Sequence, residues 1–183
     1  MNSREKIIRS FISLTKKRLT TEIPVKDICR DANISRKTFY NYFSDRQMVI
    51  EEIFVGSVEQ TIKNCLKYGM STRSFLIAVY NAFLEEKDFF AISIKDKGQN
   101  SLFDTMILRS SIIFESIFKD YITDEKRLKY LSYKFGADQA MLIRKWLTEG
   151  MKETPEFMAD IYLTNYDEFE CFHNEIAEKK HIW

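Results

Sequence analysis

Polar and aromatic side chains of the kinds that contact nucleic acids follow one another in a short segment near residue 40. The segment combines cations with hydroxyl and amide groups, all of which can donate hydrogen bonds to phosphates or to base edges. Its members are Arg36, Lys37, Thr38, Tyr40, Asn41 and Tyr42. We expect base-edge contacts mainly from Arg36, Lys37 and Thr38, and phosphate contacts from Tyr40 and Tyr42. A merely solvated surface is the alternative.

The elements that must position these side chains are two short helices joined by a tight turn. Apolar residues at helical spacing predict both helices and a small shared core: Val25, Ile28, Cys29 and Ala32 in the first, and Ile34, Phe39 and Phe43 in the second. Asn33 suits the turn because asparagine tolerates the left-handed conformation. Ser35 can cap the second helix and also reach a phosphate. Lys26 in the first helix and Arg46 at the next helix start are further phosphate candidates.

The run from Ile23 to Cys29, followed by Ala32 to Arg46, resembles the helix-turn-helix of the TetR/AcrR transcriptional regulators. The resemblance implies an all-helical fold, a DNA-binding head of three helices, and a body that binds ligand and dimerises. It also implies repression of transcription until a small molecule releases the protein. The sequence departs from the family pattern at Pro24, Asn33 and Arg46, and none of these changes argues against DNA binding.

The charge distribution favours the same interpretation. Residues 1–50 hold 11 Lys/Arg against 5 Asp/Glu, a net charge of +6, whereas residues 51–183 hold 17 against 22, a net charge of −5. A basic head on an acidic body is expected when only one end of a chain meets a polyanion. Such an asymmetry also occurs in proteins that bind no nucleic acid, so it supports the helix-turn-helix only because both lie in the same segment.

Composition and periodicity predict an all-α fold throughout. The 183 residues are 45% hydrophobic and include only 5 Gly and 2 Pro, which favours long helices. We expect a helix-turn-helix domain at 1–48 and a helical regulatory and dimerisation domain at 49–183, joined by a shared helix. The helices are predicted at 4–18, 46–68, 72–86, from Phe89 to before Gly98, and at 102–121, 125–149 and 155–178.

Two sets of apolar side chains in the body are candidates for binding. An effector pocket between helices is predicted at Phe83, Phe90, Phe103, Met106, Phe114 and Phe118. A dimer interface on the last two helices is predicted at Tyr130, Phe135, Met141, Trp146, Phe157, Ile161, Phe169, Phe172 and Tyr162. For both sets the alternative is ordinary core. Two heads are needed because one reading helix makes few base contacts.

Other classes of function find little support in the sequence. Three dispersed cysteines predict reduced thiols in the cytoplasm, and neither a signal peptide nor a membrane span is expected. His173 and His181 lack the partners of a zinc site, and no catalytic motif is present, so no enzyme, metal or cofactor is expected.

A second resemblance concerns the body. Lys97–Phe103 and Trp146–Met158 are similar to a TetR subgroup that includes regulators of dihydroxyacetone metabolism. That likeness keeps an alternative open: a protein-interaction module or a co-activator-dependent activator. The partners expected are therefore a double-stranded DNA operator, a second copy of the chain, and a small-molecule effector or a protein co-regulator.

Overall fold

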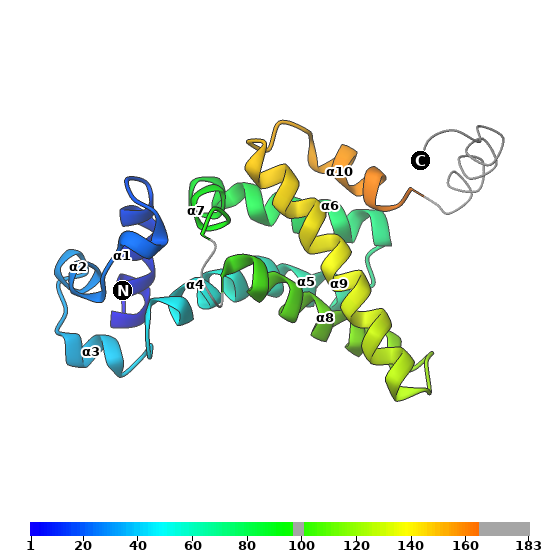
Figure 1. Cartoon of the computed structure of the whole chain (residues 1–183), viewed down its shortest axis with the longest axis horizontal. Coiled ribbons are helices and arrows are strands. Elements are labelled where there is room, and N and C mark those ends of the chain that lie inside the picture. Colours follow the sequence, from blue (N-terminus) through cyan, green and yellow to red (C-terminus); the bar gives the residue numbers. More distant parts are fainter. Residues whose placement is uncertain (97–100, 165–183) are drawn as a thin grey trace, which may run out of the picture.

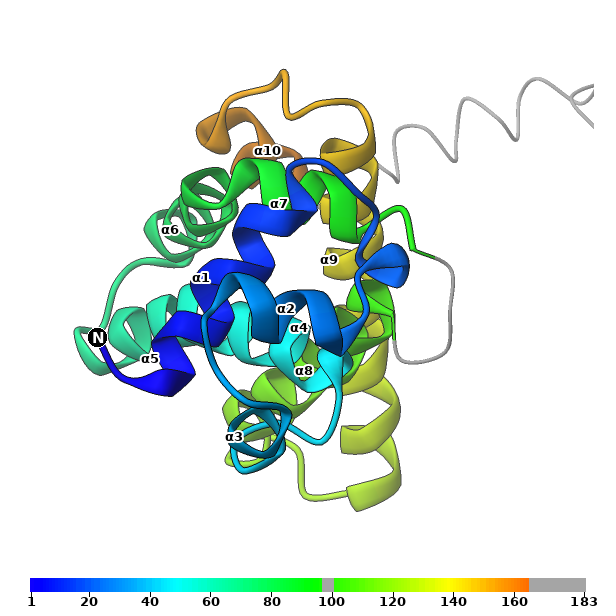
Figure 2. The ribbon, with the colours of Figure 1, turned by 90° about the vertical axis from the view of Figure 1, so that its left-hand side faces the viewer.

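The computed structural model describes residues 1–96 and 101–164, and every regular element in this part of the chain is helical (Figure 1). This confirms the all-α prediction. The head lies at one end of the molecule, and its elements are α1 (Ser3–Thr15), the 3-10 turn η1 (Thr20–Glu22), α2 (Val25–Asp31) and α3 (Arg36–Tyr40). Figure 2 looks onto this end, with α1, α2 and α3 facing the viewer.

The first helix packs behind the other two because of its apolar stripe. Ile7 and Phe11 are fully buried, and the Asn2 side chain caps the helix by accepting from the Glu5 N–H at 2.9 Å. Arg4 also forms an ion pair with Glu52 of α4 (Arg46–Phe54). The helix ends at Thr15, short of the predicted residue 18, and the chain beyond it turns so that Arg18 can reach Asp27.

One long helical segment links head and body, as predicted. It consists of α4 (Arg46–Phe54), a π-helical turn (Val55–Glu59) and α5 (Gln60–Lys67), and Gly69 follows with φ +61°. The π turn was not predicted. It places Glu59 in a buried position, where the carboxylate accepts from the Arg109 guanidinium of the body at 2.5 Å and pairs with Lys63 at 2.9 Å. Burial raises the pKa of Glu59, but these hydrogen bonds outweigh it and lower the pKa overall.

The body is a bundle of helices around this segment, and its core is continuous with that of the head. Val49, Ile53 and Phe54 of α4 are buried in the same apolar cluster as residues of both parts. The boundary predicted between residues 48 and 49 falls inside α4 and stays a prediction. The remaining elements are α6 (Thr72–Glu85), α7 (Lys87–Ser93), α8 (Leu102–Phe118), α9 (Glu125–Thr148) and α10 (Pro155–Tyr162).

The last described helix is shorter than predicted. Thr154 caps α10 by accepting from the Phe157 N–H at 3.2 Å, and Pro155 occupies the first turn, both as expected. The helix nevertheless ends at Tyr162, because the N–H groups of Leu163 and Thr164 turn back to close it. The prediction of one helix to residue 178 was therefore wrong. It relied on an apolar pattern without a stop signal.

Helices α8 and α9 pack antiparallel and unusually close at one glycine. A β-carbon at Gly136 would lie 2.6 Å from Ser111 Oγ and 2.7 Å from the Ser111 backbone nitrogen. Side chains can move aside, but the backbone of α8 can move only if the helix pair separates. The sequence therefore needs glycine here to bring the two helices together.

We expect Gly136→Ala to lower the free energy of unfolding by about 1–3 kcal/mol, the usual cost of overpacking a core. Gly56→Ala is the matched control, since nothing lies within 4 Å of a β-carbon there. The control should leave stability unchanged or raise it by up to about 1 kcal/mol, because alanine favours helix. Urea denaturation of both variants checks this, and equal effects would contradict the close approach.

Candidate nucleic-acid interface

The turn and the cap predicted from the sequence both form, and together they fix the start of α3. Asn33 has φ +51°, in the left-handed region that asparagine tolerates. Ser35 accepts from the Thr38 N–H at 3.0 Å, and the two hydroxyl groups lie 2.9 Å apart. Pro24 occupies the capping position of α2, directly before Val25, the first residue of the helix.

The packing of α3 separates core from surface as predicted. Phe39 and Phe43 are buried with Ile28 and Cys29, with their ring centroids 5.9 Å apart. The side chains predicted to bind DNA remain outside this core. Those that are exposed are Lys26, Ser35, Arg36, Lys37, Tyr40, Asn41 and Tyr42, whereas Thr38 is half-buried. Arg36, Lys37 and the tyrosines thus share the outward side of one short, capped helix and the turn after it.

The Arg46 side chain is less available for contact with DNA than the other residues predicted to bind it. Its Nη1 donates to the Thr21 carbonyl oxygen at 2.7 Å, which ties the start of α4 to η1. Thr21 in turn donates to Asp96 after α7, from its N–H at 3.2 Å and its hydroxyl at 3.0 Å. Sequence reasoning missed this chain of contacts because it joins residues 75 positions apart without any motif.

A buried carboxylate holds the helix-turn-helix against the chain before it. Asp27 of α2 pairs with Arg18 at 2.8 Å and with Arg30 at 3.1 Å. The hydrogen bond from Arg18 is the main reason that the pKa of Asp27 lies below its ordinary value, with the Arg30 charge acting in the same direction. Because Asp27 also lies in the first turn of α2, near the positive end of the helix, the pair stabilises the element that supports α3.

The lowered pKa of Asp27 makes the stability of the head sensitive to acid. The stabilisation that ionised Asp27 provides is complete at pH values above the pKa of about 4 that an aspartate has in the unfolded chain. It is lost as the pH falls through the lower pKa of Asp27 in the folded protein. We expect Asp27→Asn to be less stable than the wild type at neutral pH and to lose less stability on acidification. Denaturant titrations at neutral and acid pH check this, and a difference that stays constant with pH would contradict it.

Two cysteines are described, Cys29 and Cys65, and both are buried free thiols. Burial raises the pKa of each thiol, which keeps it protonated and unreactive. Cys29 therefore acts as a small core residue, in line with the sequence interpretation. Cys171, His173 and His181 lie outside the described residues.

The predicted effector residues do not enclose one cavity. Phe83 and Phe90 are fully buried against each other, with ring centroids 4.7 Å apart, while Phe114 and Phe118 pack with Phe135 between α8 and α9. Phe103 lies under the Arg144 guanidinium. Phe83 and Met106 do line a body cavity, but its volume is about 10 Å³, room for a single water. Most of the predicted residues are thus close-packed core aromatics in this structure, and an effector site in the body stays a prediction.

The predicted dimer residues divide into exposed and buried ones. Tyr130, Met141, Phe157 and Ile161 are exposed, whereas Phe135 is half-buried in the aromatic cluster. Trp146 is only 1% exposed: its ring packs on Tyr80 and its indole N–H donates to the Glu153 carbonyl at 3.0 Å. It belongs to the core of one chain, so its assignment to an interface was wrong. Tyr162, also half-buried, packs against the core, and Phe169 and Phe172 lie outside the described residues.

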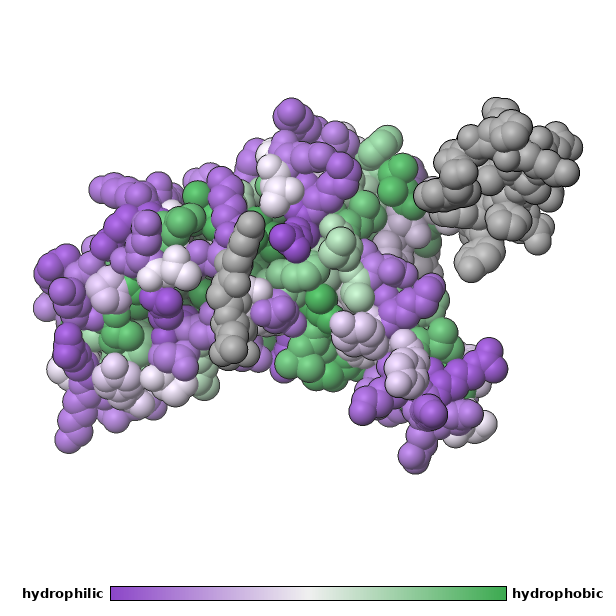
Figure 3. Space-filling view, in the orientation of Figure 1, coloured by the Kyte–Doolittle hydropathy of each residue, from purple (hydrophilic) through white to green (hydrophobic). Residues whose placement is uncertain are grey.

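Figure 3 shows hydrophobic side chains gathered over the body, while the surface of the head is mostly hydrophilic. Two apolar residues that the sequence interpretation omitted, Leu108 and Ile112 of α8, are also exposed. Their spacing of four residues was a usable signal, because α8 carries more apolar positions than its pairing with α9 requires.

Comparison with known proteins identifies the family. Residues 70–165, just over half of the chain, match the family model TetR_C_8, described as a transcriptional regulator C-terminal region. The chain belongs to the TetR family of transcriptional regulators. Over 100 residues it is 32% identical to the HTH-type dhaKLM operon transcriptional activator DhaS of Lactococcus lactis subsp. lactis (strain IL1403). This match covers 53% of the chain and 52% of that relative, about half the length of each.

Solved structures of TetR regulators share the fold, head included. A TetR transcriptional regulator from Streptococcus agalactiae 2603V superimposes with a TM-score of 0.65 at 20% identity, covering 88% of this chain and 92% of that one. The dihydroxyacetone kinase operon activator DhaS superimposes with a TM-score of 0.60 at 21% identity and the same coverage. Coverage of this extent exceeds the body alone, so the TetR arrangement of head and body is common to all three.

Within residues 1–96 and 101–164, no helix has the length and apolar character that crossing a bilayer requires. In the same part of the chain, no three His, Cys, Asp or Glu side chains cluster in a way that could hold a metal ion.

Proposed function

We propose that this chain is a homodimeric, sequence-specific DNA-binding regulator whose α3 enters the major groove. The observation that carries the proposal is the outward side of α3, where Arg36 and Lys37 project from a helix fixed by the Ser35 cap and the Phe39 core. A short rigid helix with exposed cations suits base-edge contact, and the net charge of +6 over residues 1–50 attracts the phosphates.

The surrounding side chains suit different contacts. The Thr38 hydroxyl is hydrogen-bonded to the Ser35 hydroxyl, and Thr38 is half-buried. In our proposal Thr38 contacts a base edge with its methyl group, or with its hydroxyl after the hydrogen bond to Ser35 is broken. Tyr40, Asn41 and Tyr42 follow on the exposed turn, where they can donate to phosphates. The further phosphate contacts proposed are Lys26, Ser35 and Arg46.

Selection of bound DNA from a random library by the purified chain tests this function. We expect a partly palindromic site with half-sites one helical turn apart, about 10 bp, or a multiple of it. Binding should fall steeply with salt, because several phosphates are neutralised. Failure to enrich any sequence at low salt would overturn the proposal, and enrichment of an asymmetric single half-site would overturn its dimeric form.

The direction of regulation has two candidates. A repressor released by a small-molecule effector is the mode that the TetR resemblance implies. An activator that works with a protein co-regulator is favoured by the match to the activator DhaS, and the body cavity of about 10 Å³ would have to open before an effector could enter. We propose the cytoplasm as the location for either mode.

A reporter placed behind the selected site, with and without the regulator, separates the two modes. Repression that is relieved by deletion of the gene supports the first mode, whereas loss of expression on deletion supports the second. A pull-down that retains a protein partner while no DNA binds would favour the protein-interaction module instead.

A further inference from the structure

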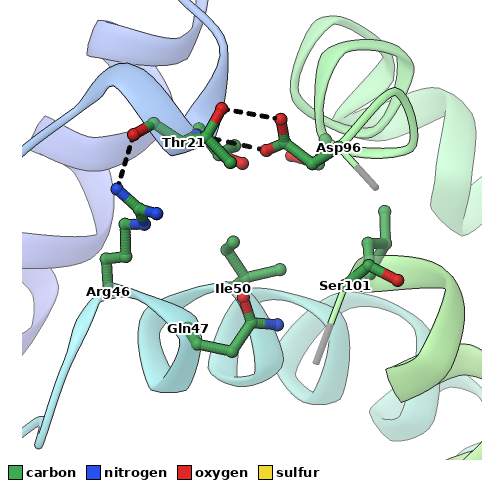
Figure 4. A pocket seen from close by; sticks show the side chains of 9 residues that line it. Thr21, Arg46, Gln47, Ile50, Asp96 and Ser101 are labelled. Carbon is green, nitrogen blue, oxygen red and sulfur yellow. Dashed lines mark hydrogen bonds between the residues drawn. The ribbon is translucent and has the colours of Figure 1, made fainter. Parts of the chain in front are cut away.

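A row of three residues joins the body to the head beside the start of α4. Asp96, which follows α7 in the body, accepts from the Thr21 N–H at 3.2 Å and from the Thr21 hydroxyl at 3.0 Å. The carbonyl oxygen of the same threonine, in η1 of the head, accepts from Arg46 Nη1 at 2.7 Å. Figure 4 shows the row, with these hydrogen bonds as dashed lines. The direction of the Arg46 side chain therefore depends, through Thr21, on a carboxylate of the body.

The body holds Asp96 in a fixed place. Its N–H donates to the Ser93 carbonyl at 3.3 Å, which closes the turn at the end of α7, and the neighbouring Ile94 is buried in the core. Near the other end of α7, the Phe89 ring packs edge-on against Phe11 of α1, with ring centroids 6.3 Å apart, and both rings are buried. Helix α7 thus contacts the head at both of its ends, and η1, which follows α1, is held beside Asp96.

The two hydrogen bonds to Asp96 fix the orientation of Thr21 as well as its distance. The N–H donates to Oδ2 and the hydroxyl to Oδ1, so each carboxylate oxygen has its own donor, and a two-point contact to an ionised group is strong and geometrically specific. The Glu22 N–H, in the same planar peptide as the Thr21 carbonyl, donates to the Leu19 carbonyl at 3.0 Å. The Thr21 carbonyl therefore has one direction, toward Arg46.

These contacts orient Arg46 but leave its charge uncompensated. A carbonyl is a neutral acceptor, and no Asp or Glu within residues 1–96 and 101–164 forms an ion pair with the guanidinium. The guanidinium keeps further N–H donors in a planar fork that matches phosphate geometry. Arg46 is also the first residue of α4, where the helix dipole disfavours a cation, so this position does not serve the helix itself. The remaining donors suit an anion outside the protein.

We propose that Asp96 is a positioning residue: through Thr21 it holds the Arg46 guanidinium ready for a phosphate of the bound DNA. This rests on the proposed function, in which Arg46 is one of the phosphate contacts. An arginine side chain that is already ordered loses less conformational entropy when it binds. Asp96 is itself an acid, and by its charge alone it would weaken the attraction to DNA. The sign of its effect on binding therefore separates positioning from simple charge.

Side-chain NMR of the free, full chain tests the positioning without DNA. The ¹⁵N relaxation of Arg46 Nε is compared between the wild type and Asp96→Ala. We expect a restricted side chain in the wild type and motion on the picosecond to nanosecond timescale in the variant. Asp88→Ala is the matched control, because it removes an exposed acid of the same helix, and Arg46 should stay restricted in it. Equal mobility of Arg46 in the wild type and Asp96→Ala would overturn the proposal.

A double-mutant cycle on the selected DNA site tests the consequence for binding. Asp96→Ala should weaken binding roughly tenfold, because a symmetric dimer must then order Arg46 at both heads. In an Arg46→Ala background the same change should not weaken binding. A loss of equal size in both backgrounds would show that Asp96 only holds the head on the body, and tighter binding of Asp96→Ala would show that only its charge matters. Either result overturns the proposal.

Variants of Thr21 decide if Asp96→Ala does not fold. Thr21→Ser retains the hydroxyl, whereas Thr21→Val loses one of the two hydrogen bonds to Asp96 and should bind the site roughly threefold more weakly than Thr21→Ser. Equal binding of these two variants would overturn the positioning role. The two proposals fail separately. If the library selection enriches no DNA, the proposed function fails while the NMR result on Arg46 stands, and if DNA binds but Arg46 is equally mobile with and without Asp96, only the positioning role fails.

Discussion

Replacement of Arg36 by alanine is expected to weaken binding to the selected DNA site by roughly 30-fold or more. A bidentate contact from arginine to a guanine edge contributes about 1–3 kcal/mol of discrimination, and a symmetric dimer loses it at both heads. Arg36 is exposed at the first position of α3 and forms no ion pair among the described residues, so the free protein should lose little stability. Fluorescence anisotropy with the labelled site, at one fixed salt concentration, measures the change.

Two comparisons separate base recognition from general attraction to DNA. Lys26→Ala removes an exposed cation of the head, and should weaken binding to all sequences alike and reduce the salt dependence. Lys129→Ala removes an exposed cation of α9 in the body and should change nothing. If Arg36→Ala behaves like Lys26→Ala, with the same loss on selected and random DNA, Arg36 contacts phosphate and the assignment to base edges is wrong.

The head was largely predictable from sequence because its determinants are local. Asn33 for the left-handed turn, Ser35 for the cap, and Phe39 and Phe43 for the core each follow from residue type and spacing within one short segment. The contacts of the head that the sequence did not predict join residues far apart in the chain. The contact of Thr21 with Asp96 depends on how α7 returns to the head, and no spacing in the sequence encodes that.

The helices of the body were predictable from the sequence, but which of their apolar residues lie in the core and which are exposed was not. Apolar periodicity marks the side of a helix that must be covered, yet it does not say whether the cover is the same chain, a second copy or a ligand. Trp146 and Met141 lie on the same helix, and one is core while the other is exposed. The predicted length of the last helix was wrong for a similar reason, since the apolar pattern continues past Tyr162 while the helix does not.

The second large effect is expected at the exposed apolar side chains of α9, which are candidates for a dimer interface. Tyr130 and Met141 are eleven residues apart, three turns of helix, so they lie on one face, and 57% of Met141 is exposed. An unpaired apolar face of this kind is covered most simply by its own copy across a two-fold axis, where each residue is used twice. We therefore expect Met141→Glu to raise the dimer dissociation constant by roughly 1,000-fold, about 2 kcal/mol for each copy.

Analytical ultracentrifugation of the variant measures this directly, and operator binding should fall with it, because a single head makes few base contacts. Tyr68→Glu is the matched control: it places the same charge at an exposed aromatic residue near the end of α5, and the protein should remain a dimer. A dimeric Met141→Glu would refute the α9 interface. Leu108→Glu then becomes decisive, because Leu108 and Ile112 form the exposed apolar face of α8, and dissociation of that variant would move the two-fold axis to α8.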